Sequence, residues 1–255
     1  MTRRRRQRAT GPRRFLDHHR ARISGVDGPT WDRLEVAAKC LYDWNGKINV
    51  VSRKNLDAQT LIEKHYMPSL ALLNVPGLRE RLDAGAAVMD VGTGGGFPGL
   101  PLAIACPNSK FTLVDSVRKK ITVVQACADA AFCRNVDALH KRVPEDFKTE
   151  RFDLVLGRAV TALPSFIDQV APVLRRASNP VSGAKLSDDE LKFPNGVVYL
   201  KGGDFDDELQ ELNLSPREEW AIEALLGGGY EDVLGGGDKR VIHLSAKDVL
   251  TAMRR

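Results

Sequence analysis

The sequence predicts an α/β fold, in which a mostly parallel sheet carries helices on both faces, preceded by a small helical addition. Three observations predict it. From residue 86 onward short apolar segments alternate with amphipathic ones, a glycine-rich loop follows the first apolar segment, and residues 24–83 show helical periodicity alone. Strands that alternate with helices are typical of βαβ units and therefore of parallel sheets.

The composition excludes several classes of protein. The chain has 255 residues, of which 43% are hydrophobic and 28% are charged, so it can bury a sizeable core. We expect no transmembrane helix, because no apolar run is long enough, and no secretory signal peptide, because no apolar stretch follows the first arginines. The four cysteines form no CxxC pair and, with five scattered histidines, no zinc spacing, so we expect reduced thiols and no metal.

The positive charge of the chain is concentrated at its start. Residues 1–22 contain nine Arg and one Asp, a net charge of +8, so that residues 23–255 carry −3 of the overall +5. We interpret residues 1–23 as a basic, disordered arm or leader. An Arg-rich segment suits a polyanion such as RNA, an organelle transit peptide, or a solvated leader without a partner, and these three interpretations remain open.

Residues 24–83 are expected to be helical. Leu34, Ala37, Ala38, Leu41 and Trp44 fall on one face of a helix over residues 31–45. Pro29-Thr30 is a plausible helix entry, with Thr30 as the N-cap. Residues 55–75 indicate one or two further helices, which Pro68 breaks or opens.

The remaining segments alternate in the order expected of a parallel sheet. Predicted strands lie at residues 86–91, 110–115, 135–143, 151–160, 195–203 and 240–245, and predicted helices at 100–106, 116–132, 163–176 and 204–212. Residues 177–194 are polar and are interpreted as a loop. Ligands of such sheets bind at the carboxyl ends of the strands, so Asp90, the glycine loop, Asp115, Val143 and Arg158 should meet at one edge.

The loop at residues 92–99 holds five glycines in eight positions, which allow positive φ and a close approach of a ligand to the backbone. It opens a helix whose free N–H groups favour an anionic group. The spacing Gly94-x-Gly96-x-x-Gly99, with Asp115 at the end of the next strand, formally matches a dinucleotide fingerprint. Nicotinamide dehydrogenases and S-adenosylmethionine (SAM) methyltransferases both place an acid there to bind ribose hydroxyls.

Two features favour a methyltransferase over a dehydrogenase. Asp90 stands directly before Val-Gly-x-Gly, and an acid there suits a cationic ligand such as the ammonium or sulfonium of SAM. The loop also carries Phe97-Pro98, which is bulky at the position where a pyrophosphate would need bare backbone.

The segment Gly92 to Pro101, with the sequence GTGGGFPGLP, resembles motif I of the bacterial 16S ribosomal RNA guanine-N7 methyltransferases, also named glucose-inhibited division protein B. Most methyltransferase families lack the Phe/Leu-Pro-Gly continuation. Further blocks resemble the family in the same order: Trp44-Asn45 with Asn49, Lys64-His65 with Ser69-Leu70, Thr112 to Ser116 with Lys119-Lys120, Phe152 to Val155 with Arg158-Ala159, and Leu200-Lys201-Gly202. The resemblance covers about residues 31–205.

The resemblance implies a class I SAM-dependent methyltransferase fold, Rossmann-like and seven-stranded, over residues 84–255, with a helical addition at 24–83 and an insertion loop at 177–194. The implied reaction transfers a methyl group from SAM to N7 of a guanine in the decoding-region loop of the small-subunit RNA, and leaves S-adenosylhomocysteine. Guanine N7 has a lone pair and no proton, so catalysis needs no general base and is mainly proximity and electrostatics. The implied partner is this RNA or a 30S-type subunit, without metal or membrane, and we expect a monomer.

The resemblance also implies roles at the cofactor. Asp90, Gly92, Gly94 and Gly96 would hold the methionine part of SAM, with Phe97 as a cap. Asp115 would accept from the ribose hydroxyls, or else cap the helix that follows. Val143, Pro144 and Glu145 match the family's adenine contact, although Pro144 replaces a Glu and has no N–H to offer. Arg158 would lie beside SAM and bind the RNA phosphate or the guanine edge, as a substrate-positioning residue.

Candidate RNA contacts are Asn45, His65, Lys119, Lys120 and Lys201, each with a structural or solvated alternative. Pro68 stands where the family has Asp, so an Asp–His pairing in that block is absent. The family resemblance points to the bacterial cytoplasm, whereas the Arg-rich start leaves a chloroplast or another organelle open. A SAM methyltransferase of another substrate and a non-catalytic RNA- or nucleotide-binding module are the alternative functions.

Overall fold

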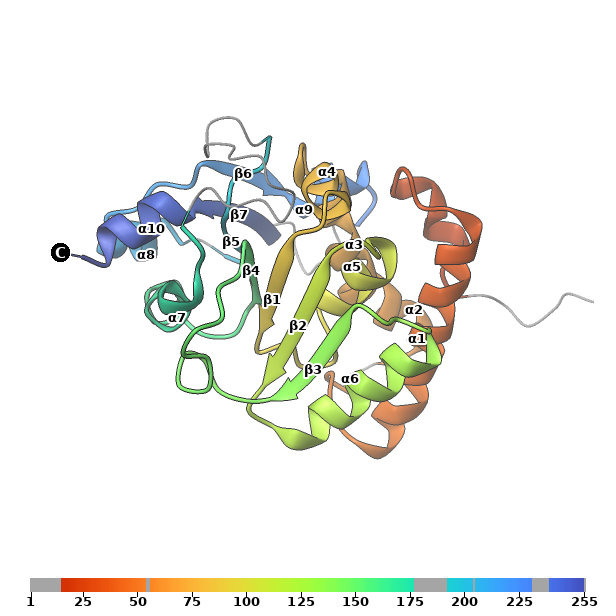
Figure 1. Ribbon diagram of the computed structural model, residues 1–255. Coiled ribbons are helices and arrows are strands. Elements are labelled where there is room, and N and C mark those ends of the chain that lie inside the picture. The colour runs from red at the N-terminus through yellow and green to blue at the C-terminus, as the bar shows by residue number, and fades with distance from the viewer. Residues whose placement is uncertain (1–14, 54–55, 177–191, 204, 231–238, 255) are drawn as a thin grey trace, which may run out of the picture.

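The molecule is built around one sheet of seven strands in the order β3-β2-β1-β4-β5-β7-β6 (Figure 1). The structure is a computed structural model that describes residues 15–53, 56–176, 192–203, 205–230 and 239–254. The strands are β1 (Ala87–Val91), β2 (Lys110–Asp115), β3 (Val136–His140), β4 (Leu154–Arg158), β5 (Gly196–Gly202), β6 (Glu218–Ala221) and β7 (Lys239–Ser245). The α-helices are α1 (Gly28–Lys47), α2 (Ala58–Leu61), α3 (Met67–Leu70), α4 (Leu78–Asp83), α5 (Gly99–Ala105), α6 (Arg118–Ala130), α7 (Leu163–Val170), α8 (Asp206–Leu212), α9 (Ile222–Leu226) and α10 (Ala246–Ala252).

The strand order brings the predicted site residues to one edge of the sheet. Strands β1 to β5 are parallel, whereas β7 runs antiparallel to β5 and β6 antiparallel to β7. Val91 is paired with Val114 on one side and with Gly157 on the other. Asp115 follows Val114, and Arg158 follows Gly157. These two residues therefore flank the carboxyl end of β1, where the order of the strands reverses.

Helices cover both faces of the sheet (Figure 1). Helices α1, α3, α5 and α6 lie on one face, and α7, α8 and α10 lie on the other. Successive strand residues alternate between the two apolar clusters: Val88 and Leu156 belong to the first, and Met89 and Val155 to the second. Burial of both faces explains why these strands read as continuous apolar runs.

The six predicted strands are confirmed to within a few residues, and the α/β class is confirmed. The seventh strand, β6, was not visible in the pattern because it consists of Glu218, Glu219, Trp220 and Ala221, with no apolar alternation. It is an edge strand that pairs only with β7. The helix predicted over residues 163–176 ends earlier, at Val170, and is followed by a 3-10 turn, η4 (Ala171–Val173), that contains Pro172.

The N-cap of helix α1 lies three residues before the predicted cap. Asp27 is the N-cap, and its carboxylate accepts from the backbone N–H of Thr30 at 2.8 Å, so the assignment of Thr30 as N-cap is wrong. An Asp cap followed by Pro in the first turn is a strong entry signal. The predicted apolar face is confirmed for Leu34, Ala37, Ala38 and Leu41, which are buried.

Residues 58–74 wind without interruption through α2, a π-helical turn η2 (Ile62–Tyr66), α3 and a 3-10 turn η3 (Ala71–Asn74). Pro68 neither ends this run nor opens a separate helix, because it lies in the first turn of α3, directly after the π-turn. Pro68 has no N–H, so the carbonyl of Lys64, four residues earlier, lacks its α-helical donor. This carbonyl is therefore available to a donor from another element.

The expectation of a disordered arm up to residue 23 is wrong for residues 15–23, and residues 1–14 lie outside the described residues. Leu16 is fully buried, and the backbone N–H groups of Phe15 and Leu16 donate to the carboxylate of Glu35 at 2.8 and 3.0 Å. A 3-10 helix, η1 (Asp17–Arg22), follows. The guanidinium of Arg22 donates to the carbonyls of Leu226, Gly227 and Gly228 at the end of α9, so its charge stabilises the helix C-terminus.

Most of the predicted loop 177–194 lies outside the described residues, but its last residues pack on the sheet. Phe193 is buried and stacks on the ring of His243, with ring centroids 4.2 Å apart. Burial lowers the pKa of His243 to about 4, helped by the nearby charge of Arg217. Among the described residues no helix is long and apolar enough to cross a membrane.

We predict that His243 makes the protein less stable in mild acid. The folded state keeps His243 neutral down to about pH 4, whereas an unfolded chain binds the proton from about pH 6.5 downward, so stability falls as the pH falls through this window. Between about pH 7.5 and about pH 5, His243→Gln should lose about 2 kcal/mol less unfolding free energy than the wild type. Urea unfolding at both pH values measures this, with the exposed His18→Gln as control. An unchanged pH dependence in His243→Gln would contradict it.

Candidate active site

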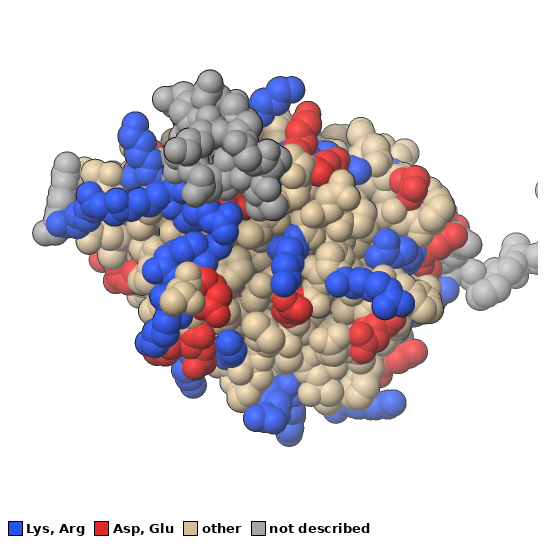
Figure 2. Space-filling model, viewed as in Figure 1, with Lys and Arg blue, Asp and Glu red and all other residues tan. Residues whose placement is uncertain are grey.

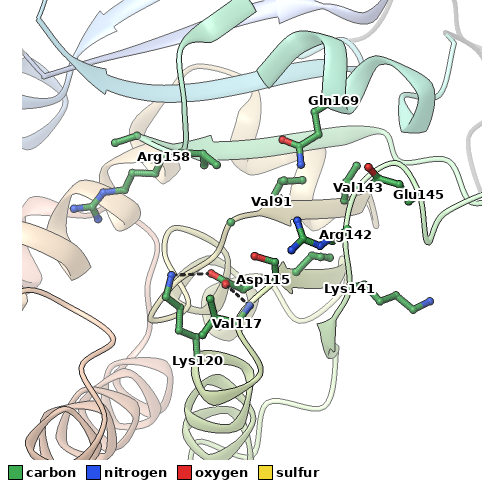
Figure 3. A pocket seen from close by; sticks show the side chains of 15 residues that line it. Val91, Asp115, Val117, Lys120, Lys141, Arg142, Val143, Glu145, Arg158 and Gln169 are labelled. Atoms are coloured by element: carbon green, nitrogen blue, oxygen red, sulfur yellow. Dashed lines mark hydrogen bonds and ion pairs between the residues drawn. The ribbon is translucent and has the colours of Figure 1, made fainter. Parts of the chain in front are cut away.

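A cavity of about 350 Å³ opens at the carboxyl ends of β1, β2, β3 and β4 (Figure 3). Its lining comprises Val91, Gly92, Val114, Asp115, Ser116, Val117, Lys120, Lys141, Arg142, Val143, Glu145, Arg158, Ala159, Val160 and Gln169. Figure 3 shows that Asp115 and Arg142 point toward the centre of this cavity. The volume lies in the range of small-molecule sites, about 300–1,000 Å³.

Asp90 holds the glycine loop from behind the cavity. Its Oδ2 accepts from Thr93 Oγ1 at 2.7 Å and from the backbone N–H of Gly99 at 2.9 Å. Asp90 is fully buried and is absent from the cavity lining. Its carboxylate therefore does not line the cavity, contrary to the expectation that it faces a cationic ligand. Burial raises the pKa of Asp90 to about 7, although the bonds from Thr93 and Gly99 and the charge of Arg158 oppose that shift. Its Oδ1 has no hydrogen-bond partner among the described residues.

Asp115 ties the loop to the end of β2. Its Oδ2 accepts from the backbone N–H of Gly94 at 3.1 Å and from Lys120 Nζ at 3.2 Å, and its Oδ1 accepts from the N–H of Val117 at 2.8 Å (Figure 3). A carboxylate offers about four acceptor positions, so one remains for a ligand and a second is released when Lys120 moves aside. Asp115 thus lines the cavity and holds the N–H of Val117, the N-cap residue of α6, while its contact with ribose hydroxyls stays a prediction.

The loop glycines are required by their backbone conformation. Gly92, Gly94 and Gly96 have φ of +68°, +59° and +96°, values that side chains with a Cβ rarely adopt. A Cβ on Gly92 would also lie 2.9 Å from Val160 Cγ1. Gly92 lines the cavity, whereas Gly94 and Gly96 lie in the loop beside it.

The far end of the cavity has apolar walls. Val143 is buried in the lining and Glu145 lies at its rim, but Pro144 is not part of the lining, so its expected contact with adenine is not supported. Val117 and Val160 are apolar side chains exposed by 44% and 37%, and both line the cavity. Apolar side chains that stay exposed in a cavity lining suit an apolar or aromatic part of a ligand.

Arg158 leaves β4 and reaches across to the helical addition (Figure 3). Its Nη2 donates to the carbonyl of Lys64 at 2.6 Å and to His65 Nδ1 at 3.2 Å, and its Nη1 donates to the carbonyl of His65 at 3.4 Å. The Lys64 carbonyl is the one that Pro68 leaves without an α-helical donor. Burial lowers the pKa of Arg158 to about 10, so the guanidinium stays charged near neutral pH.

His65 and Phe97 stack beside this guanidinium. The ring centroids of His65 and Phe97 are 5.2 Å apart, and the guanidinium carbon of Arg158 lies 5.9 Å from the Phe97 ring. Burial and the positive charge of Arg158 lower the pKa of His65 to about 3. His65 is therefore neutral at physiological pH and accepts a hydrogen bond from Arg158. Phe97 is buried against His65 and Tyr66 and does not line the cavity, so it closes the loop side rather than covering a ligand.

The other candidate RNA contacts have different surroundings. Asn45 is buried, and its side-chain amide bonds the backbone of Val50 and Val51, a structural role that corrects the expectation of a base contact. Lys120 pairs with Asp115 at the cavity, and Lys201 pairs with Glu208, which also accepts from the N–H of Leu163. Lys119 is exposed at the start of α6.

The sequence did not single out Val117, Val160 or Gln169 as part of this site, although all three line the cavity. Arg142, which also lines it, begins the stretch 142–145 that resembles the family's adenine contact. Val117 and Val160 carry a weak signal, because each follows within two residues of a strand end that was predicted to face the ligand. Gln169 comes from α7 and carries no such signal, since only the fold brings it to the edge of β4.

The sheet order, the antiparallel β7, the glycine loop after β1 and the acid at the end of β2 together define a class I methyltransferase. A solved structure of the magnesium protoporphyrin IX methyltransferase of Synechocystis PCC 6803 has a similar fold, with a TM-score of 0.52 at 12% identity over 87% of this chain and 99% of that one.

Residues 32–213 match the family described as rRNA small subunit methyltransferase G. The ribosomal RNA small subunit methyltransferase G of Flavobacterium psychrophilum is 40% identical over 210 residues, 82% of this chain and 88% of that protein. The protein of the same name from Cytophaga hutchinsonii is 40% identical over 212 residues, 82% of this chain and 90% of that protein. The chain belongs to the rRNA small subunit methyltransferase G family, so the family resemblance of the sequence is confirmed.

We predict that Gly94→Val abolishes binding of SAM. A β-branched residue cannot easily take φ near +59°, so the loop would shift and the bond from the Gly94 N–H to Asp115 would break. Calorimetric titration with SAM measures the effect. Gly85→Val is the matched control, because Gly85 also has a positive φ, +94°, but lies before β1 at the opposite edge of the sheet. Wild-type affinity in a folded Gly94→Val protein would contradict the role of the loop.

Proposed function

We propose that this chain transfers the methyl group of SAM to N7 of a guanine in the RNA of the small ribosomal subunit. The observation that carries the proposal is the placement of Arg158, which joins the lining of the cavity on one side to the helical addition on the other. A substrate that enters between these two parts meets a charged fork next to the cofactor cavity.

The residues of the cavity fit SAM. Asp115 has acceptor positions for ribose hydroxyls, and Val117, Val143 and Val160 offer apolar walls for adenine. The loop at Gly94 to Gly96 lies at the end of the cavity where the methionine part would extend, with the unpartnered Oδ1 of Asp90 behind it. When bound, SAM supplies an electrophilic methyl group on a sulfonium.

The chain itself has to position the guanine rather than to activate it. Guanine N7 presents a lone pair and carries no proton, so no side chain has to remove one. His65 is consistent with this role, because its low pKa keeps it neutral and its Nδ1 already accepts a hydrogen bond from Arg158. Arg158 stays charged and offers donors to guanine O6 or to a phosphate, so the protein contributes proximity and electrostatic orientation.

The form of the substrate, the oligomeric state and the location belong to the same proposal. A 30S-type subunit or its free RNA is the substrate, and the enzyme acts as a monomer. We place it in the bacterial cytoplasm, where small subunits are assembled. A chloroplast or another organelle is the alternative that the seven Arg of residues 1–14 favour, since a transit peptide has such a composition.

Transfer of labelled methyl from SAM to undermethylated 30S subunits, compared with free 16S RNA and with protein substrates, tests the function. Label should enter the small-subunit RNA, and borohydride and aniline treatment should cleave the RNA at the labelled guanine, since N7-methylguanine is sensitive to this chemistry. Label in another substrate would favour a methyltransferase of different specificity. SAM binding without any transfer would favour a non-catalytic module.

We predict that deletion of residues 1–14 weakens RNA binding and flattens its salt dependence. Seven arginines vanish, while the folded residues 15–23 that dock on Glu35 and α9 remain. The slope of log affinity against log salt should fall by up to about 5, at about 0.7 per lost contact to single-stranded RNA. Filter binding to 30S subunits over a KCl series measures it, and SAM affinity is the control that should not move. An unchanged slope would support the leader or transit interpretation instead.

We predict that Arg158→Ala slows methyl transfer about 10- to 150-fold, because a charge-assisted hydrogen bond is worth roughly 1.5–3 kcal/mol. Arg158→Lys should recover only part of the rate, since it keeps the charge and loses the fork. Rates on 30S subunits are measured beside the melting temperature. Arg134→Ala, an exposed arginine just before β3 at the opposite edge of the sheet, is the matched control. Full activity in Arg158→Ala, or a loss explained by unfolding, would show a purely structural residue.

A further inference from the structure

Arg158 contacts His65, and the positive charges of two lysines from other elements act on the same ring. Arg158 ends β4, Lys64 belongs to the π-turn η2, and Lys239 begins β7. The charges of Arg158, Lys239 and Lys64 all lower the pKa of His65, and those of Arg158 and Lys64 lower the pKa of Lys239, which is half-buried. The three cations therefore lie within electrostatic reach of one another, which is unfavourable unless an anion joins them.

The register of the sheet places these groups on the same face. Arg158 pairs with Leu200, and Lys239 pairs with Gly202, two residues further along the same strand β5. Leu156 and Val241, two residues from Arg158 and Lys239 respectively, both belong to the apolar cluster under the helical addition. Since alternate strand residues share a face, Arg158 and Lys239 point to the side where η2 lies. Lys201 and Arg240 are on the other face, where both approach the ring of Phe205.

Arg158 has no direct ion pair among the described residues, although the charge of Asp90 acts on it and partly offsets the lowering of its pKa by burial. Its direct partners are two backbone carbonyls and the neutral His65, all of which orient the guanidinium without neutralising it. The carboxylate of Asp90 faces Thr93 and Gly99 instead. Among the described residues no carboxylate forms an ion pair with Lys64, Lys239 or Arg158, whereas Lys120 and Lys201 at the same edge are both paired.

On the face of the molecule that Figure 2 shows, positive side chains occur together with negative ones. In Figure 2 the Lys and Arg side chains gather on the left, where α7, α8 and α10 lie, but Asp and Glu side chains are interspersed with them. Lys64 and Lys239 are also absent from the lining of the cofactor cavity, which Arg158 alone of the three joins. An anion held by both lysines therefore lies outside the cavity, on the side from which a substrate enters.

We propose that Lys64, Lys239 and Arg158 form an oxyanion subsite that binds a backbone phosphate of the RNA next to the target guanosine. The proposal rests on the proposed function for the identity of the nucleic acid. A phosphate held here is fixed by charge from three directions, so it sets the register of the strand while the base reaches the cavity. The π-turn η2 contributes to this arrangement twice. It carries the side chain of Lys64, and the carbonyls of Lys64 and His65 orient Arg158.

The test compares Lys64→Gln, Lys239→Gln and the double variant with Lys247→Gln. Lys247 is an exposed lysine of α10, at the opposite edge of the sheet, and serves as the matched control. Binding to undermethylated 30S subunits is measured over a KCl series at constant Mg²⁺, together with KM, kcat and SAM affinity. The slope of log affinity against log salt should fall by about 0.7 in each single variant and by about 1.4 in the double variant. KM for the subunit should rise, SAM affinity should stay unchanged, and Lys→Arg at either position should restore the slope.

Two results would overturn the subsite. A slope equal to that of Lys247→Gln would show that neither lysine contacts a phosphate. A fall in SAM affinity with an unchanged slope would show that the cluster binds the carboxylate of the cofactor instead. The slope is a binding measurement, so it decides on the subsite even if wild-type protein binds subunits without methylating them, an outcome that would overturn the proposed function alone.

Discussion

The structure depends on two carboxylates that hold the loop between β1 and α5 from opposite sides. Asp90 draws Thr93 and Gly99 together, and Asp115 holds the N–H of Gly94. Between them they fix a backbone that has three glycines at positive φ, and Thr93 adds a turn whose carbonyl accepts from the N–H groups of Gly96 and Phe97. Burial of the Asp90 carboxylate costs free energy, as its raised pKa indicates. In return the loop already has a fixed shape before a ligand binds, which lowers the ordering cost of binding.

The helical addition is part of the site and not an appendage. It covers one face of the sheet with α1 and α3, and its π-turn supplies the carbonyls that orient Arg158. Pro68 favours this contact, since it leaves the carbonyl of Lys64 without an α-helical donor. The block that departs from the family at Pro68 thus contacts Arg158 through its backbone, and this contact joins the helical addition to the end of β4.

Protonation states at this edge favour positioning over proton transfer. His65 is held neutral beside a charged Arg158, because an imidazolium there would be buried next to a like charge. The residues at this edge thus offer donors and fixed charge, which is all that the proposed transfer to N7 would require of them. Lys120 and Lys201 have carboxylate partners and stabilise the cavity wall and α8 respectively. Cations without such a partner remain available to bind a ligand.

The α/β class, six of the seven strands and the family could be predicted from the amino-acid pattern, because buried parallel strands are apolar on both faces and the loop from Gly92 to Pro101 is a specific motif. The same pattern also predicted which strand ends meet, since parallel strands present their carboxyl ends at one edge. Which polar side chains are free to bind a ligand depends on contacts that only the folded chain makes. The side chain of Asn45 is hydrogen-bonded to the backbone of Val50 and Val51, and residues 15–23 fold although their composition suggests an arm. Local pattern cannot reveal either outcome, because the partners of Leu16 and Arg22, Glu35 and the end of α9, lie far away in the sequence.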